Sequence, residues 1–399
     1  MPIGSGTVRM SEIRTEWGRS GTIKMSEMYR GGSHVLAKAG NNGSTNLAAS
    51  VPTSGAIRFV DFRDTTKGFR KTYSSGATNQ DASAVFGSDY GVNYPKEIVV
   101  NSGVELGATS TSQEALQIDS GLAGGLTITN NGTLSGAGGA AGSAGGDAFQ
   151  ADVACTLINN GTIRAGGGGG GSGGSGGSGG TGGQGQTSST APGSWSGYQS
   201  SLYNPQYGVH WASGYGWSWY WGNNSVLSTA SGTSMNHGGY NYERQSGASY
   251  HYIGGITVHV YPSRRRQASV TSYTYHNGGA GGSGGSGGAG GVGQGYGQSA
   301  TSGSSGSGGS GGSGGGTNAG SGGTGGTGGS GGAGGGYGAS GSSGNTGSTG
   351  NTGGNGNHTN GSGGSGGSGG SSGAAAGKYI RGLSNVTLTQ NGTVQGGTA

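Results

Sequence analysis

Aromatic and basic side chains are concentrated in one segment of the chain, residues 187–277. This segment holds five of the six tryptophans, twelve of the nineteen tyrosines and the triplet Arg264-Arg265-Arg266. Aromatic faces stack on sugar rings or dock on protein loops, and guanidinium groups bind phosphates and carboxylates. The sequence therefore predicts a binding surface here. Its candidate contact residues are Trp211, Tyr215, Trp217, Trp219, Tyr220, Trp221, Tyr240, Tyr242, Arg264, Arg265 and Arg266.

Two readings of these residues stay open. Trp217, Trp219 and Trp221 alternate and would share one face of a strand, either as contact residues or as the small core of a β-rich insertion. The arginine triplet either meets phosphates or acidic sugars, or forms a solvated turn between two strands.

Catalysis is not expected. A glycosidase usually needs two carboxylates, and residues 153–399 contain only Glu243, so a pair would require Asp147 or Asp152 to reach across or a second subunit to contribute. No serine-hydrolase elbow, zinc-protease motif or phosphate loop occurs. The histidines are scattered, so no metal and no cofactor are expected. Residues 153–399 carry seven Lys/Arg over a long segment, and this low density argues against nucleic-acid binding. The single cysteine, Cys155, cannot form an intrachain disulfide.

The N-terminal residues 1–63 contain a short repeat that is expected to form small β-rich attachment units. Residues 5–14 return at 20–29 and, more loosely, at 54–63. In each unit an apolar pair, such as Val8 and Met10, fits a short strand, and Ser11 or Ser26 would then cap a helical turn. Such small units must stack on each other or dock onto a partner to bury their apolar faces. An attachment module and a compact subdomain without a partner are the two alternatives.

A second repeat predicts a β-strand base made from residues 64–165 and a C-terminal closing segment, 378–399. Its copies are at residues 126–134, 156–163 and 386–394, each with apolar residues alternating with Thr before an Asn-Gly-Thr sequence. Asn-Gly favours a tight turn with positive φ, and the flanking alternation favours half-buried strands. The copies bracket the glycine-rich region, so glycine segments should leave this base and return to it.

Glycine accounts for 108 of the 399 residues, much of it in Gly-Gly-X triplets within residues 166–186 and 278–377. Composition alone is typical of a flexible linker. A period of three also fits a polyproline-II-type helix, whose two bare glycine edges let neighbouring backbones approach and form hydrogen bonds. The triplets therefore predict a bundle of packed polyglycine II helices. Gly166 to Gly171 has three bare edges and should lie innermost.

Strands with Asn-Gly-Thr sequences followed by Gly-Gly-X tracts resemble the distal adhesins of T-even-type phage long tail fibres, over about residues 126–399. The N-terminal Met-Ser-Glu units resemble segments of phage tail proteins. The resemblance implies a sandwich of polyglycine II helices whose loops contact a host receptor. This sequence departs from that pattern by having one long aromatic insertion in place of several short loops.

The expected fold is thus mostly β with little helix: N-terminal repeats, a strand base, and a polyglycine II bundle bearing the aromatic-rich insertion. The expected function is a non-enzymatic tail-fibre or tail-tip adhesin that binds an outer-membrane protein or a surface glycan. A purely structural virion component is the alternative. Expected partners are other tail proteins, through the N-terminal repeats, and the host receptor. Neither nucleic-acid binding nor membrane insertion is expected, and a homotrimer is an alternative to a monomer. The start of the sequence lacks a secretion signal, so synthesis in the host cytoplasm and assembly into a virion are expected.

Overall fold

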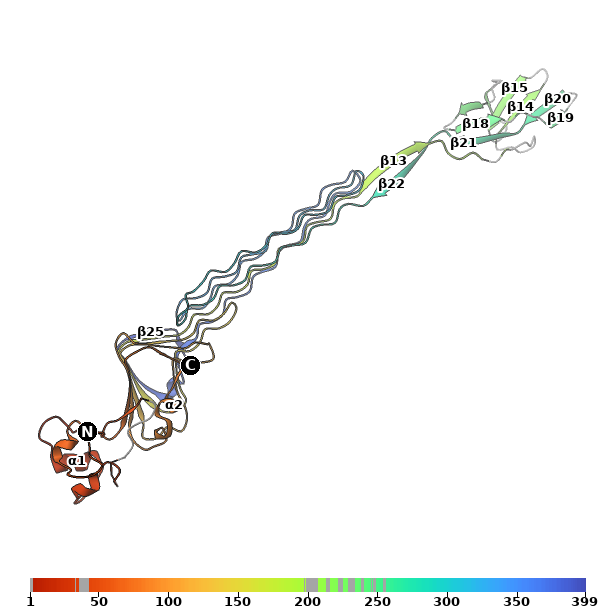
Figure 1. Cartoon of the computed structure of the whole chain (residues 1–399). Coiled ribbons are helices and arrows are strands. Elements are labelled where there is room, and N and C mark those ends of the chain that lie inside the picture. The colour runs from red at the N-terminus through yellow and green to blue at the C-terminus, as the bar shows by residue number, and fades with distance from the viewer. Residues whose placement is uncertain are drawn as a thin grey trace.

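The computed structural model is an elongated molecule with a base, a rod and a head (Figure 1). Both chain termini lie at the base, and the head is at the far end of the rod. Strands dominate and helices are few and short, which confirms the predicted mostly-β class. None of the helices described is long and apolar enough to span a bilayer. The structure describes residues 3–32, 34–35, 43–196, 198, 207–212, 216–221, 225–228, 234–237, 240–244, 246, 249–253 and 256–399.

The base is a three-sided parallel β-solenoid, in which each turn of the chain adds one strand to each of three sheets. The first sheet is β2 (Phe69–Tyr73), β5 (Lys96–Val100), β8 (Leu126–Asn130), β11 (Cys155–Asn159) and β24 (Val386–Gln390), and β1 (Thr45–Asn46) pairs antiparallel with β2 at its edge. The second is β3 (Ala77–Thr78), β6 (Glu105–Gly107), β9 (Thr133–Ser135), β12 (Thr162–Arg164) and β25 (Thr393–Gln395). The third is β4 (Gln80–Asp81), β7 (Leu116–Ile118), β10 (Phe149–Ala151), β23 (Lys378–Arg381) and β26 (Gly397–Thr398). Short helices α2 (Ala82–Phe86), η3 (Gly87–Asp89) and η4 (Leu383–Asn385) complete the base.

The order of strands shows where the rod and head are inserted. Strand β12 is followed in sequence by the whole rod and head, and the next strand of the same solenoid turn is β23. The repeats at residues 126, 156 and 386 therefore stack side by side, with Ile128 beside Leu157 and Leu157 beside Leu388. As the repeats predicted, the glycine-rich segments leave this base and return to it.

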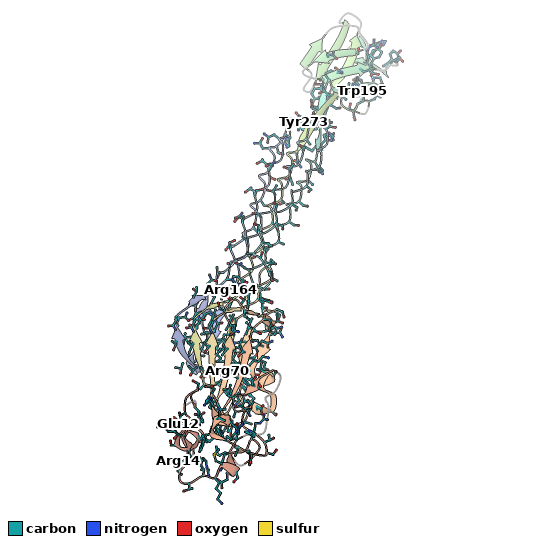
Figure 2. The ribbon with its side chains drawn as sticks, turned by 60° about the vertical axis from the view of Figure 1, so that its left-hand side comes forward. Glu12, Arg14, Arg70, Arg164, Trp195 and Tyr273 are labelled. Atoms are coloured by element: carbon teal, nitrogen blue, oxygen red, sulfur yellow. The ribbon has the colours of Figure 1, made fainter. Side chains whose placement is uncertain are left out.

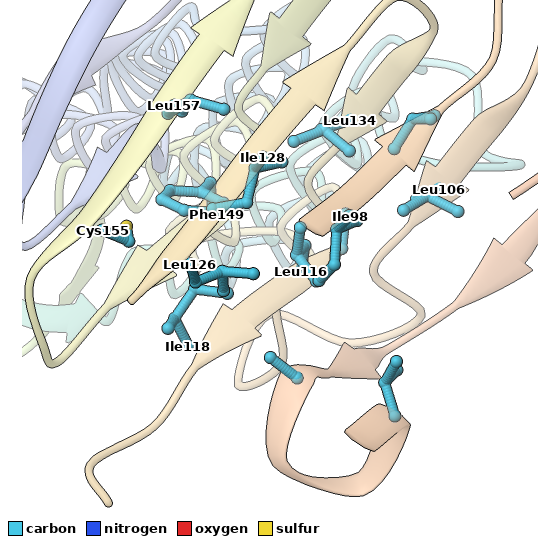
Figure 3. Packing of buried hydrophobic residues seen from close by; sticks show 14 of the residues in the cluster. Ile98, Leu106, Leu116, Ile118, Leu126, Ile128, Leu134, Phe149, Cys155 and Leu157 are labelled. Carbon is cyan, nitrogen blue, oxygen red and sulfur yellow. The ribbon is translucent and has the colours of Figure 1, made fainter. Parts of the chain in front are cut away.

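Alternating burial along the strands builds the solenoid core. Every second residue of β5, β8 and β11 points inward, so Ile98, Ile128 and Leu157 are fully buried and stacked from turn to turn (Figure 3). Burying a Leu or Ile side chain contributes about 1.5 to 3 kcal/mol. The core of the base thus comes from the period-two pattern of its strands.

The Asn-Gly corners differ from the predicted tight turn with positive φ. Each joins strands of two different sheets, and neither Asn131 nor Gly132 has positive φ. The corner is fixed by the neighbouring turn instead, because Asn130 Nδ2 donates to Asn159 Oδ1 at 2.7 Å inside the solenoid. Glycine is needed for close approach: a Cβ on Gly161 would lie 2.0 Å from the carbonyl oxygen of Gly132.

The N-terminal repeats form helical turns that share one core. These turns are α1 (Met10–Glu16), η1 (Met25–Met28) and η2 (Phe59–Phe62). The ninth residue of each repeat, Ile13, Met28 and Phe62, is fully buried in one cluster. The units therefore bury their apolar faces against each other.

Two details of these repeats were predicted wrongly. The pairs Val8/Met10, Ile23/Met25 and Ile57/Phe59 do not form strands, because the helical turns start at Met10, Met25 and Phe59. Ser11 and Ser26 lie inside these turns and are not caps. A basic residue, Arg9, Lys24 or Arg58, occupies the N-cap position just before each turn. Its backbone N–H donates to an acidic side chain three residues later, as Arg9 N does to Glu12 Oε2 at 2.8 Å.

A buried lysine, Lys96, links two loops of the solenoid through hydrogen bonds. Lys96 on β5 is 2% exposed, and its Nζ donates to the carbonyl oxygens of Val92, Tyr94 and Ala123 at 2.7, 3.0 and 2.7 Å. Burial lowers the pKa of this ammonium to about 8, with nearby Asp89 opposing the shift. The ammonium joins loops that follow different solenoid strands.

We expect Lys96→Met to lower the free energy of unfolding of the base by about 2 to 4 kcal/mol, because three carbonyls lose their buried donor. Arg70→Met is the control, since Arg70 makes a surface ion pair with Glu97 at 2.6 Å and should change stability by less than about 1 kcal/mol. Thermal unfolding followed by circular dichroism measures both. Equal effects would show that the Lys96 contacts do not hold the base together.

The rod consists of extended glycine-rich tracts that run back and forth between base and head (Figure 1). We name them tract A (166–184), B (277–295), C (299–316), D (319–336), E (339–357) and F (359–377). Tracts B, A and F form one layer, and C, D and E form the second. A short hairpin, residues 136–147, covers tract A at the base.

Backbone hydrogen bonds join the tracts with a period of three residues. Gly173, Gly176 and Gly179 donate to tract B, while Gly174, Gly177 and Gly180 donate to tract E, all at 2.8 to 2.9 Å. Tracts D and F in turn donate to carbonyls of tract A. Gly166 to Gly171 is buried and bonded to the hairpin and to tracts B, D, E and F, which confirms its predicted innermost place.

Candidate recognition head

The rod holds the head through a two-stranded antiparallel ribbon, β13 (Gly185–Ala191) and β22 (Val270–His276). Side chains at the distal turns of the rod bind the start of this ribbon. Asn318 Nδ2 and Asn357 Nδ2 donate to the carbonyl oxygen of Gln186 at 3.2 and 2.9 Å. The ring of His358 lies 4.8 Å from that of Tyr275. The ribbon is thus tied to the end of the rod.

The proximal turns of the rod are fixed to the base by tyrosines. Tyr296 packs on Gly107 of β6, because a Cβ on that glycine would overlap the ring. Tyr337 lies under the guanidinium of Arg164, whose Cζ is 3.8 Å from the ring centroid, and Arg164 also pairs with Glu105 at 2.8 Å. Burial raises the pKa of Tyr337, with Arg164 opposing the shift. Both ends of the rod are therefore anchored by side chains that interrupt its Gly-Gly-X repeat.

Two antiparallel sheets form the described part of the head. The larger is β16 (Ser225–Ser228), β15 (Gly216–Trp221), β14 (Tyr207–Ala212), β20 (Ile256–Tyr261) and β19 (Ser249–Ile253). The smaller is β17 (Ser234–His237), β18 (Tyr240–Arg244) and β21 (Ser263–Gln267).

The backbones of the predicted tryptophans lie on two paired strands. Trp217, Trp219, Tyr220 and Trp221 are on β15, and Trp211 of β14 is the register partner of Trp217. Pairing of β15 with β16 shifts between Trp219 and Tyr220. Tyr215 and the side chains of these other residues lie outside the described part of the chain, so their shared face stays a prediction.

The arginine triplet lies on strand β21, so the prediction of a solvated turn between two strands is wrong. Arg264, Arg265 and Arg266 are half-buried on β21 and pair in register with Glu243, Tyr242 and Asn241 of β18. Arg264 Nη2 lies 3.2 Å from Glu243 Oε1. Arg265 Cζ lies 4.8 Å from the ring centroid of Tyr240.

One aromatic residue at this strand was missed as a contact residue. Trp195 is half-buried, and the Cζ atoms of Arg264 and Arg266 lie 4.7 and 4.5 Å from its ring centroid. Tyr198, which is exposed, lies 4.7 Å from Arg264 Cζ. Trp195 and Tyr198, which follow Pro192-Gly193, could have indicated this site from the sequence. The prediction instead favoured residues 207–221, where aromatic residues are denser.

The two predicted tyrosines of β18 have different environments. Tyr242 is 3% exposed and belongs to the interior of the head, whereas Tyr240 is half-buried. Tyr250 of β19, which was not predicted, is the most exposed large apolar side chain described, at 69%. Tyr250 is therefore better placed than Tyr242 to contact a ligand at the surface of the head.

The carboxylates named in the sequence do not meet. Glu243 is in the head, whereas Asp147 and Asp152 flank β10 in the base, at the other end of the rod (Figure 1). Asp147 accepts from the backbone N–H of Lys378 at 2.6 Å and lies 3.5 Å from Arg381 Nε. Neither aspartate can reach across to Glu243 within one chain. The residues described contain no group of three His, Cys, Asp or Glu side chains placed to hold a metal ion.

Comparisons with protein families, with curated proteins and with solved structures each find no match to this chain.

Proposed function

We propose that this protein is a phage tail-fibre or tail-tip adhesin whose head binds a host bacterial surface without catalysis. The supporting observation is the position of the head. Its aromatic and basic residues lie at the far end of a rod that is anchored at both ends, and both chain termini lie at the opposite end of the molecule (Figure 1). Such a shape presents a binding surface away from an attachment point.

The rod supports the same proposal. We interpret tracts A to F as polyglycine II helices, since their hydrogen bonds repeat every third residue and run to several neighbours. Tracts A to F contain no Lys, Arg, Asp or Glu. A stiff uncharged spacer holds the head away from the virion and makes no strong electrostatic contact of its own with a charged cell surface.

The N-terminal module is the proposed attachment site for another tail protein. Phe59 and Val60 on η2 are 43% and 44% exposed, although Ile57 and Phe62 of the same repeat pack into the shared core. Exposed apolar residues beside a packed core are typical of a protein contact. The module would thus place the chain in the virion.

A binding role is also favoured by the contacts of Glu243, the only carboxylate of residues 153–399. This side chain pairs with Arg264 and is separated from Asp147 and Asp152 by the length of the rod. A single carboxylate held in an ion pair, far from these two aspartates, does not provide the pair of carboxylates that glycoside hydrolysis needs.

The test removes the head and closes the ribbon. Ala191 and Val270 are register partners, so replacing residues 192–269 by Asn-Gly should complete a two-residue hairpin without disturbing the rod. We expect cell binding to fall by at least about a hundredfold, because the proposed contact surface is gone. The control is the circular-dichroism signal and thermal transition of the base and rod, which should be unchanged.

Binding is measured with labelled protein on host cells by flow cytometry. Undiminished binding by a folded headless chain would refute the proposal for the head. Absence of binding by the intact chain as well would favour a purely structural role in the tail.

A further inference from the structure

A pocket of about 370 Å³ lies where the head joins the ribbon, at residues 193–196 and 265–267, a region that we call the neck. Residues 193–196 run along the edge of β21, where Gly193 N donates to Gln267 O at 2.9 Å and Ser196 N donates to Arg265 O at 2.8 Å. Trp195, Tyr240, Arg265 and Arg266 line the pocket. Figure 2 shows Trp195 at this end of the head, near Tyr273 of the ribbon. A pocket of this volume lies in the size range of small-ligand sites.

The guanidinium groups at this pocket are held in place by aromatic rings. Arg266 Cζ is 4.5 Å from the ring centroid of Trp195, and Arg265 Cζ is 4.8 Å from that of Tyr240. A guanidinium stacked by its face still has in-plane N–H donors, and these match a carboxylate or phosphate. Stacking therefore orders the donors before any ligand arrives, which lowers the entropy lost on binding.

Charge in the head is not balanced. Residues 187–277 contain four arginines and a single carboxylate, Glu243, and that carboxylate pairs with Arg264. Within the described residues Arg266 makes no ion pair, and Arg264 Nε, Arg265 Nη1 and Arg266 Nε are all buried without a hydrogen-bond partner. A buried donor left without an acceptor is unfavourable by about 1 to 3 kcal/mol, more for a charged group. An anionic ligand at the pocket would offset the excess positive charge of the head.

We propose that this neck pocket binds a saccharide through a carboxylate or phosphate group, with Arg266 binding the oxyanion and Trp195 and Tyr240 lining the sugar. This inference rests on the proposed function, because a head that binds a bacterial surface would meet such saccharides there. Uronic acids and phosphorylated sugars share this chemistry, and the experiment separates them.

The experiment titrates the intact chain with methyl glucuronide, glucose 6-phosphate, methyl glucoside and inorganic phosphate, using calorimetry and saturation-transfer NMR. At least one charged sugar should bind in the millimolar range or tighter, and about tenfold or more tightly than the neutral glucoside. The tighter of the two charged sugars identifies the anionic group. Inorganic phosphate should bind more weakly than either, because it makes no contact with the aromatic walls.

Variants assign the binding to the pocket. Arg266→Gln should weaken binding of the charged sugar about tenfold or more, and Arg266→Lys by less, because the lysine keeps the charge but not the planar fork. The control Arg244→Gln removes one positive charge from the same head, at a residue whose Cζ stacks 4.7 Å from the ring centroid of Tyr261 and outside the pocket. It should change affinity by less than about twofold. Near-UV circular dichroism checks that each head is folded, and if Arg266→Gln is not, Arg266→Lys is compared with Arg244→Lys.

Three outcomes would overturn the proposal: no saturable binding of either charged sugar, phosphate binding as tightly as the sugars, or equal losses in the Arg266 and Arg244 variants. Cell binding is measured separately on the same proteins. Cell binding without sugar binding would refute the pocket and leave the adhesin proposal intact. Sugar binding without cell binding would do the reverse.

Discussion

Gly177→Ala should destabilise the rod by about 3 kcal/mol or more, although it adds only one methyl group. Gly177 lies in the central tract A, and a Cβ there would be 1.8 Å from the carbonyl oxygen of Ser365 in tract F. The atoms that this Cβ would meet all belong to the backbone of tract F, so no flexible side chain can move aside. Tract F must shift, which breaks its hydrogen bonds to tract A, including Ser365 N to Ser178 O at 2.8 Å.

A matched control lies across the same contact. Gly366 follows Ser365 on tract F, is exposed, and has open space where its Cβ would be. Its φ is not positive, so Gly366→Ala should be neutral or stabilising by up to about 1 kcal/mol, because alanine has fewer conformations in the unfolded chain. Scanning calorimetry and limited proteolysis of the rod compare the two variants. Similar stability of both would mean that the tracts are not packed as described.

The second large effect is expected at the asparagine pair inside the solenoid. Asn159 is fully buried, accepts from Asn130 Nδ2 at 2.7 Å and donates to Gln390 Oε1 at 3.2 Å. Asn159→Ala removes these bonds and a third, to the carbonyl oxygen of Thr393 at 3.4 Å, and leaves one buried N–H of the Asn130 amide without its acceptor. We expect the base to lose about 2 to 4 kcal/mol of stability.

The neighbouring residue provides the comparison for this prediction. Asn160 is exposed, and it too makes two amide bonds between turns, to Asn131 at 3.0 Å and from Asn391 at 2.9 Å. Because water replaces those bonds, Asn160→Ala should lose less than about 1 kcal/mol. Chemical denaturation of the two variants measures the difference. A loss as large for Asn160 as for Asn159 would argue against burial as the cause.

Local patterns carried much of the fold prediction. Strands with alternating apolar and Thr residues were predictable because a half-buried strand has a period of two, and the repeats at 126, 156 and 386 were predictable as parts of one strand base because they share one sequence pattern. The inner place of Gly166 to Gly171 followed from the absence of any Cβ over six residues. In these cases the information lies within one segment.

The errors came from contacts between distant segments. Asn-Gly was read as a turn with positive φ, because nothing local shows that Asn130 and Asn159 bond to each other across solenoid turns. The triplet Arg264-Arg265-Arg266 was read in part as a turn, since its pairing with β18 and its stacking on Trp195 depend on residues far away in sequence.

The sequence by itself determined the mostly-β class, the common strand base of the repeats and the three-residue period of the glycine tracts, because side-chain size and polarity recur there at fixed spacing. Only the tertiary structure decided that tyrosines and asparagines anchor the two ends of the rod, and that Trp195 meets Arg266 where the head joins the ribbon. Those arrangements arise from packing between segments far apart in the chain, and no local spacing records them.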